Sequence, residues 1–297
     1  MKKLHKSGMR LCDGAFVVIK FVLWRKYRIE VDVVRKLLSN DLVMPELNRT
    51  PYLDVIDVPF EDEGGASLIV SEVCVEHYAW ADQTHANDML HSIRQLAEAV
   101  HFLHANGIAH CDIWQPNVVI RLPLRRPLQW TFIDFNSAVV AKDVKLDAPS
   151  PTITPMHHTG MRFEAPEFYA PYWTRLDPFA FDIYCFGVLA EAMLKDGYVT
   201  ISANMRNLID EMRDEDPVAR PDSASVLSRI SSEVDALIEG EDPEDALSCL
   251  LASSVKLRAH RNLYWKPHSL LLYLSALEDD TRNKDEGVYA ERAIKVE

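Results

Sequence analysis

The feature that most constrains the fold is a change of hydrophobic pattern near residue 75. Before that point the apolar residues form short runs typical of strands, with one segment at helical spacing among them. These segments are Phe16–Trp24, Ile29–Leu38 (the helical one), Tyr52–Val58 and Ser67–Val73. From Asn87 onwards helical spacing dominates. We therefore expect an α+β fold in which a small β-rich part, ending near Glu72–Glu76, precedes a larger α-helical part.

The larger part opens with a long helix, whose apolar residues keep helical spacing until Asn106-Gly107 stops it. Two short apolar runs, Asn117–Leu122 and Trp130–Phe135, then predict a small hairpin. Further helices are predicted at Phe181–Leu194, Met205–Met212, Ser223–Ala236 and Pro243–Ala276. Residues 143–160, which contain prolines and several Ser and Thr, are typical of a loop.

The bulk composition excludes some classes of partner. The net charge of −13 argues against a nucleic acid or an anionic membrane surface, because both need a basic footprint on the protein. The cysteines are scattered and form no CxxC pair, which is typical of free thiols in a reducing compartment. No apolar stretch reaches the ~18 residues of a membrane span. We therefore expect an intracellular protein, cytoplasmic or nuclear.

One polar loop carries residues suited to phosphoryl transfer. The stretch H-C-D-I-W-Q-P-N, His110–Asn117, follows the long helix and holds the acid Asp112 five positions before the amide Asn117. Transfer from a nucleotide needs a cation on the phosphates, oxygen ligands for Mg²⁺ and a group that orients the attacking hydroxyl. Taken alone, the loop is equally compatible with an ordinary polar turn.

Two charged residues in apolar surroundings extend this set. Lys20 ends the apolar run V-V-I-K, where burial is costly unless the ammonium is paired, and Glu30 in the following helix is a suitable partner. Asp134 lies between Ile133 and Phe135, and a buried carboxylate also needs a partner or a metal. The alternatives are a lysine on an edge strand with a solvated glutamate, and an aspartate that caps a turn.

Taken in order, these motifs resemble a eukaryotic-type protein kinase domain over roughly residues 7–236. V-V-I-K resembles the motif of the phosphate lysine, with Lys20 in that role and Glu30 as its helix partner. V-S-E-V-C, Val70–Cys74, resembles the hinge, with Ser71 as gatekeeper. H-C-D-I-W-Q-P-N resembles the catalytic loop, and D-F-N, Asp134–Asn136, resembles D-F-G.

The motifs of the helical part also match in order. Ala165-Pro166-Glu167 is identical to A-P-E, and Asp182 resembles the acid that anchors the catalytic loop. Arg220 resembles the arginine that pairs with the A-P-E glutamate. The resemblance implies that Glu167 and Arg220 form a buried ion pair. It also implies that Asp182 accepts hydrogen bonds from the backbone near His110 and Cys111.

The resemblance implies a two-lobed fold with an incomplete N-lobe sheet and an ATP-dependent transfer to a protein Ser/Thr hydroxyl. We expect a truncated N-lobe at 1–74, a helical C-lobe at 75–237 and a helical extension at 238–297. The implied cofactors are ATP and Mg²⁺. The implied roles are catalytic for Asp112, Asn117, Lys20 and Glu30, nucleotide-binding for Lys20, Glu72, Cys74, Asn117 and Asp134, and metal-binding for Asp134 and Asn117.

The chain also departs from the kinase pattern. The glycine-rich loop over the phosphates is absent, and its place would lie before Met1, so we expect either that the sequence is shortened there or that the protein lacks the loop. Trp114 replaces the usual lysine of the catalytic loop, Cys111 replaces the arginine and Asn136 replaces the D-F-G glycine. Thr159-Gly160 inverts the usual Gly-Thr order.

Three functions therefore stay open. The first is an atypical protein Ser/Thr kinase, and the second is a pseudokinase that serves as a binding or scaffold module. The third is a small-molecule kinase of the aminoglycoside-phosphotransferase type, because H-x-D-x-x-x-x-N followed by I-D-F occurs there too. Ala165-Pro166-Glu167 together with Arg220 argues against this third function.

Overall fold

The computed structural model describes residues 5–11, 14–59, 64–76, 86–121, 129–141, 165–168, 177–196 and 199–238. The chain divides into two compact units, 1–240 and 241–297, and every described residue lies in the first. The predicted loop 143–160, the inverted Thr159-Gly160 and the predicted helix Pro243–Ala276 lie outside the described residues. None of the described helices is long and apolar enough to cross a membrane.

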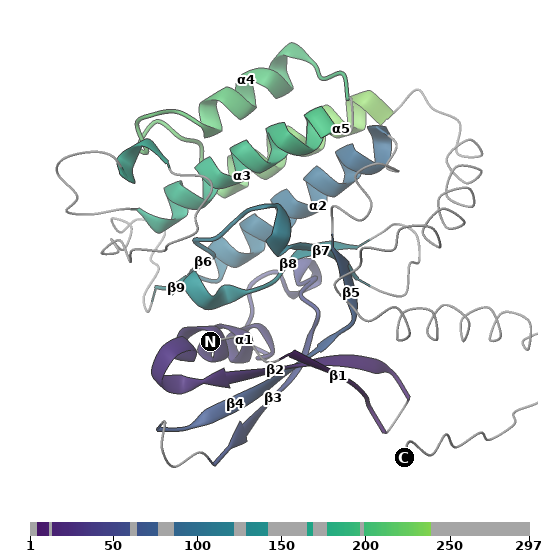
Figure 1. Cartoon of the computed structure of the whole chain (residues 1–297). Coiled ribbons are helices and arrows are strands. Elements are labelled where there is room, and N and C mark those ends of the chain that lie inside the picture. The colour runs from purple at the N-terminus through teal and green to yellow at the C-terminus, as the bar shows by residue number, and fades with distance from the viewer. Residues whose placement is uncertain are drawn as a thin grey trace, which may run out of the picture. The chain divides into compact units, whose positions relative to one another are not determined.

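The β-rich part is a four-stranded antiparallel sheet with the strand order β1-β2-β4-β3 (Figure 1). Its strands are β1 (His5–Met9), β2 (Phe16–Leu23), β3 (Tyr52–Val58) and β4 (Ala66–Glu72). The strands predicted at 16–24, 52–58 and 67–73 are therefore confirmed to within one residue at their ends. Their apolar residues are β-branched or aromatic and fit the half-buried surface of a pleated sheet.

Helix α1 (Trp24–Leu37) begins directly after β2, earlier than the predicted start at Ile29. Trp24 looks like a strand residue in the sequence, but its backbone N–H donates to Gly65 O at 3.1 Å and its indole N–H to Ser67 Oγ at 2.7 Å. Gly65 has a φ of +124°, and an added Cβ would lie 2.3 Å from the Trp24 ring. The indole therefore packs flat on a glycine, a contact that hydrophobic periodicity cannot predict.

The helical part consists of α2 (Ala86–Ala105), α3 (Pro178–Asp196), α4 (Ala203–Met212) and α5 (Ser223–Ile238), which gather on the far side of the short strands from the sheet (Figure 1). Helix α2 packs against α3 and α5, and α4 packs on both of these. The predicted stop of the long helix is confirmed. Gly107 has a φ of +67° and donates its N–H to His104 O at 2.9 Å, a conformation that favours glycine after a helix end.

Short strands connect the two parts. Strands β5 (Cys74–Glu76), β7 (Val118–Arg121) and β8 (Trp130–Phe132) form an antiparallel sheet, and β6 (Ile108–Ala109) pairs with β9 (Val139–Val140). The predicted hairpin is confirmed as β7 and β8. Strand β5 was not predicted, because its partner β7 lies more than forty residues away and leaves no local signal.

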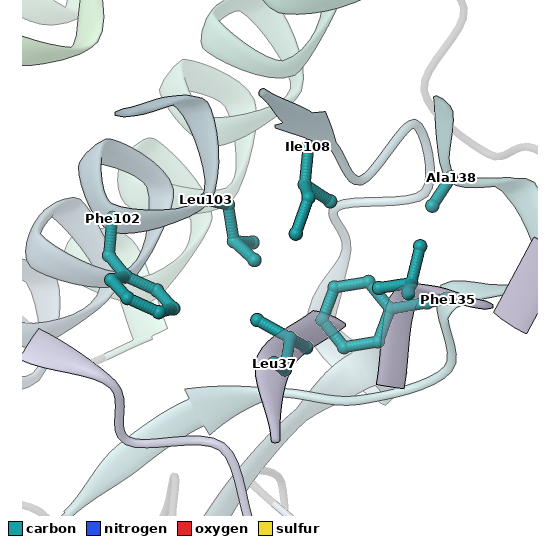
Figure 2. Close-up of a cluster of buried hydrophobic side chains, with 7 residues drawn as sticks. Leu37, Phe102, Leu103, Ile108, Phe135 and Ala138 are labelled. Atoms are coloured by element: carbon teal, nitrogen blue, oxygen red, sulfur yellow. The ribbon is translucent and has the colours of Figure 1, made fainter. Parts of the chain in front are cut away.

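A hydrophobic cluster joins α1, α2 and the turn after Asp134 (Figure 2). Its buried members are Val33, Leu37, Phe102, Leu103, Ile108, Phe135 and Ala138. Each of the larger members, the Val, Leu, Ile and Phe side chains, contributes about 1.5–3 kcal/mol relative to exposure. The cluster packs α1, which carries Glu30, against the turn that follows Asp134, and so fixes these two elements relative to each other.

Candidate active site

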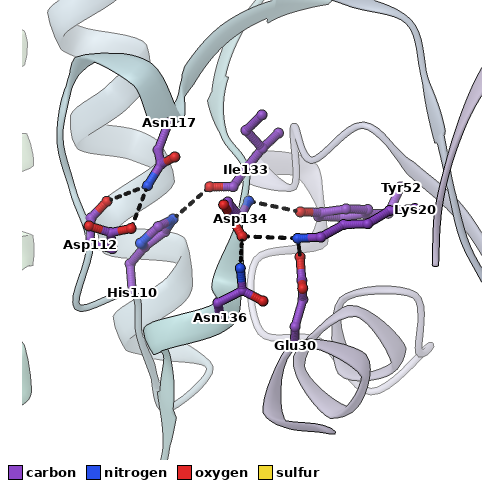
Figure 3. Close-up of polar contacts among 9 residues, drawn as sticks. All are labelled: Lys20, Glu30, Tyr52, His110, Asp112, Asn117, Ile133, Asp134 and Asn136. Carbon is purple, nitrogen blue, oxygen red and sulfur yellow. Dashed lines mark hydrogen bonds and ion pairs between the residues drawn. The ribbon is translucent and has the colours of Figure 1, made fainter. Parts of the chain in front are cut away.

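Lys20 lies in the middle of β2, between His5 of β1 and Ile69 of β4. Its Nζ forms an ion pair with Glu30 Oε1 and lies 2.9 Å from Asp134 Oδ1 (Figure 3). Glu30 is only 1% exposed, so its carboxylate depends on the lysine for charge compensation. The lysine thus joins β2, α1 and the turn after β8 at one point.

Asp134 adopts a left-handed backbone conformation, with φ and ψ both at 69°. A residue other than glycine in this region is uncommon and marks either a turn or a functional site, and aspartate tolerates it better than most. Its N–H donates to the Tyr52 hydroxyl at 3.4 Å, and its Oδ1 accepts a hydrogen bond from Asn136 Nδ2 (Figure 3). The carboxylate is therefore held from two sides, by Lys20 and by Asn136.

Tyr52 supports Asp134 from the first residue of β3. Its ring packs against Phe135 with the centroids 6.0 Å apart. Burial, followed by the negative charges of Glu30 and Asp134, raises the pKa of the Tyr52 hydroxyl well above its usual value. The hydroxyl therefore stays protonated and neutral throughout the physiological pH range.

Asp112 and Asn117 are in direct contact within their loop (Figure 3). Asn117 Nδ2 donates to the backbone O and to Oδ2 of Asp112, both at 2.9 Å. The Asn117 backbone accepts the Ile133 N–H at 3.0 Å, which ties the loop to the segment that carries Asp134. Both side-chain bonds use the amide nitrogen, so the oxygen of Asn117, the atom that could bind a cation, takes no part in them.

Asp182 anchors this loop from the first turns of α3, as predicted. The residue is fully buried, and its carboxylate accepts the His110 N–H at 2.6 Å and the Cys111 N–H at 2.7 Å. His104 Nε2 lies 3.1 Å from the same carboxylate. Cys111 has a φ of +56°, and burial, followed by the charge of Asp182, raises the pKa of its thiol. The anchored backbone sets the direction in which Asp112 leaves the loop.

Glu167 and Arg220 form the predicted ion pair. Nη1 and Nη2 of Arg220 each donate to one carboxylate oxygen of Glu167 at 2.7 Å. The arginine side chain is 0% exposed, and it also donates to Ala180 O at 3.1 Å and to Asp214 O at 2.9 Å. All three guanidinium nitrogens therefore have partners, as a buried cation requires.

The two predicted nucleotide-binding residues of the hinge lie at the end of the sheet. Glu72 pairs with Val17 of β2, the strand that carries Lys20. Its carboxylate accepts Nε and Nη2 of Arg121, both at 2.8 Å, and Cys74 Sγ lies 3.8 Å from its backbone O. Burial, followed by the charge of Glu72, raises the pKa of the Cys74 thiol to about 12. The Glu72 side chain thus engages Arg121 and the Cys74 thiol lies near the Glu72 backbone, and none of these contacts involves Lys20 or Asp134.

The oxygen atoms near Asp134 suit a magnesium ion, which prefers carboxylate, amide and water oxygens. Asp134 supplies a carboxylate and Asn117 an amide oxygen, while Asn136 Oδ1 is buried without a hydrogen-bond partner among the described residues. Within the described ranges, no three His, Cys, Asp or Glu side chains gather where they could hold a metal ion. A cation here would therefore rely on amide oxygens as well as on carboxylate.

Comparison with known proteins bears on the fold. No protein-family model matches the chain. The chain is 28% identical over 261 residues to the probable serine/threonine-protein kinase zyg-1 of Caenorhabditis elegans, an alignment that covers 78% of this chain and 33% of that protein. The crystal structure of the Rad53 kinase domain and SCD2 superposes with a TM-score of 0.51 and 18% identity, over 76% of this chain and 82% of that one. This chain has a protein-kinase-like fold.

The kinase-like domain has the expected α+β architecture of a small sheet followed by a larger helical part. Lys20, Glu30 and Asp134 meet at one point, and Asp112 meets Asn117. Sequence reasoning missed the contacts of Tyr52 and of the Asn136 amide with Asp134. The replacement of a motif glycine by Asn136 was the available signal for the second contact, whereas Tyr52 stands in an ordinary strand and gave none.

Proposed function

We propose that this kinase-like domain transfers the γ-phosphoryl group of ATP to a Ser or Thr hydroxyl of a protein. The observation that carries the proposal is the simultaneous pairing of Lys20 with the buried Glu30 and with Asp134. A lysine placed in this way presents its charge where the nucleotide phosphates would lie. The similarity to a probable serine/threonine-protein kinase supports the same reaction.

In the proposed reaction, Lys20 contacts the α- and β-phosphates and Glu30 keeps its ammonium in place. Asp134 and Asn117 would hold Mg²⁺, which when bound neutralises charge on the phosphates. Asp112 accepts a hydrogen bond from the acceptor hydroxyl and orients it for in-line attack. The new O–P bond forms as the bond to the β–γ bridging oxygen breaks, ADP leaves, and the hydroxyl proton passes to Asp112.

The described contacts bear on the two alternatives. Trp114 brings no positive charge to the catalytic loop, which favours a pseudokinase. The Glu167–Arg220 pair belongs to the protein-kinase pattern and argues against a small-molecule kinase. The nucleotide contacts of Glu72 and Cys74, and domain boundaries after residues 74 and 237, remain parts of the proposal.

Thermal melting of the purified chain with and without Mg·ATP tests the proposal most directly. Ligand at a hundred times its Kd adds ~2.7 kcal/mol to the free energy of unfolding, or roughly 5–10 °C in Tm for a domain of this size. We expect such a shift for the native chain and none for Asp134→Asn. A native chain that melts at the same temperature with and without Mg·ATP would support the pseudokinase alternative.

Trp114→Lys should raise kcat by roughly tenfold or more, because one preorganised donor at a developing charge is worth about 10²–10³ in kcat. The lysine would add a cation next to the transferred phosphoryl group, where the indole has none. The assay measures phosphate transfer from ATP to a library of Ser/Thr peptides, with Trp114→Phe as the control that keeps an uncharged ring. An unchanged or lower rate for the lysine variant would argue against this role for position 114.

A further inference from the structure

Asn136 makes an unusual pair of contacts beside Asp134 (Figure 3). Its Nδ2 donates to Asp134 Oδ1, the oxygen that also lies 2.9 Å from Lys20 Nζ. Its own Oδ1 is buried and has no hydrogen-bond partner among the described residues. The kinase pattern has a glycine at this position, so the pattern assigns no function to this side chain.

A buried amide oxygen without a partner is costly, because it has lost its hydrogen bonds to water and gained none in return. Such an atom is therefore retained more readily where it has a ligand in the working state of the protein. An amide oxygen is a hard donor of the kind that binds Mg²⁺, Mn²⁺ and Ca²⁺. The oxygen and nitrogen of an amide also have nearly the same size, and the terminal torsion of asparagine rotates easily.

The spacing of the two residues suits a shared cation. Asp134 and Asn136 flank Phe135 across a single 3₁₀ turn, Phe135–Ser137, and their side chains are already in contact. Phe135 is fully buried in the hydrophobic cluster, which keeps the turn in place. Oxygen ligands at alternate positions of a tight loop are the arrangement by which calcium loops bind their ion.

We propose that Asn136 is a metal ligand. In the absence of a cation the amide nitrogen bonds to Asp134, and when a divalent cation binds to Asp134 the amide turns over and presents Oδ1 to the cation. This inference rests on the metal site of the proposed function and adds an oxygen ligand that the kinase motif does not provide. We therefore expect the site to bind a divalent cation even without nucleotide.

The test is a titration of the full chain with Mn²⁺ in the absence of nucleotide. Binding is measured as the loss of the EPR signal of free Mn²⁺. We expect Asn136→Ala to weaken Mn²⁺ binding at least tenfold, because the oxygen is lost. Asn136→Asp, which keeps an oxygen donor and adds charge, should bind Mn²⁺ at least as tightly as the native chain. Asn204→Ala is the matched control, because Asn204 bonds to Glu233 at 3.0 Å on an exposed helix face and should leave binding unchanged.

The outcomes separate this inference from the proposed function. Binding that survives in Asp134→Asn would show that the cation does not sit at Asp134, and the proposed metal site would be wrong. If Asp134→Asn loses binding while Asn136→Ala binds as well as or better than the native chain, Asn136 only positions the carboxylate and the inference alone is wrong. If Asn136→Ala does not fold, Asn136→Asp decides the question. Weaker Mn²⁺ binding by this variant than by the native chain would show that Asn136 is not a metal ligand.

Discussion

Asp112→Asn is expected to lower kcat by about 10²–10⁴-fold, the range that one positioned proton acceptor contributes. The Asp112 carboxylate is held by the Asn117 amide at 2.9 Å, and its loop backbone is anchored to the buried Asp182. An amide at position 112 keeps the size of the side chain but cannot accept the hydroxyl proton. The rate of phosphate transfer to Ser/Thr peptides, measured with saturating Mg·ATP, shows the loss.

Two controls make this result specific to the chemical step. Asp112→Asn should keep the Tm shift with Mg·ATP, because Lys20 and Asp134 are intact. Asp210→Asn, on the exposed face of α4, should change neither the rate nor the Tm shift by more than the experimental error. Turnover at the native rate by Asp112→Asn would remove Asp112 from the mechanism and, with it, the main reason for treating the loop as catalytic.

Glu167→Gln is expected to lower the free energy of unfolding by ~3–5 kcal/mol, because it leaves a buried charge without its partner. Arg220 is 0% exposed and donates two 2.7 Å bonds to this carboxylate. The neutral amide keeps one oxygen but places an N–H group against the other guanidinium nitrogen. Urea-induced unfolding, compared at the transition midpoint, measures the change.

The Arg229–Glu211 pair is the matched control for this experiment. Its side chains are 38% and 47% exposed, so Glu211→Gln should cost less than ~1 kcal/mol. The double variant Glu167→Gln with Arg220→Met should recover part of the loss, because it removes the unpaired charge. A cost for Glu167→Gln that is no larger than that of Glu211→Gln would show that the pair behaves like a surface contact.

The elements of the fold were largely readable from the sequence, because each depends on local pattern. The strand Tyr52–Val58 begins and ends where predicted, and Gly107 ends the long helix as its left-handed conformation requires. The strand predicted at Ser67–Val73 breaks instead at Val73, where the chain leaves one sheet and Cys74 pairs with Arg121 of another. The second pairing depends on a distant strand, so no property of residues 67–76 could reveal it.

The contacts of the candidate site also include some that the sequence predicted and others that it did not. The sequence by itself determined which residue types are present and in which order. This was enough to suggest the Lys20–Glu30 pair and, through the resemblance to protein kinases, the Glu167–Arg220 pair. Only the tertiary structure decided that the Tyr52 hydroxyl meets the Asp134 N–H and that the Asn136 amide turns to the Asp134 carboxylate. The physical reason is that charge, hydrophobicity and spacing along the chain can be read directly from the sequence. The direction of a hydrogen bond, in contrast, depends on where the packed core places both partners.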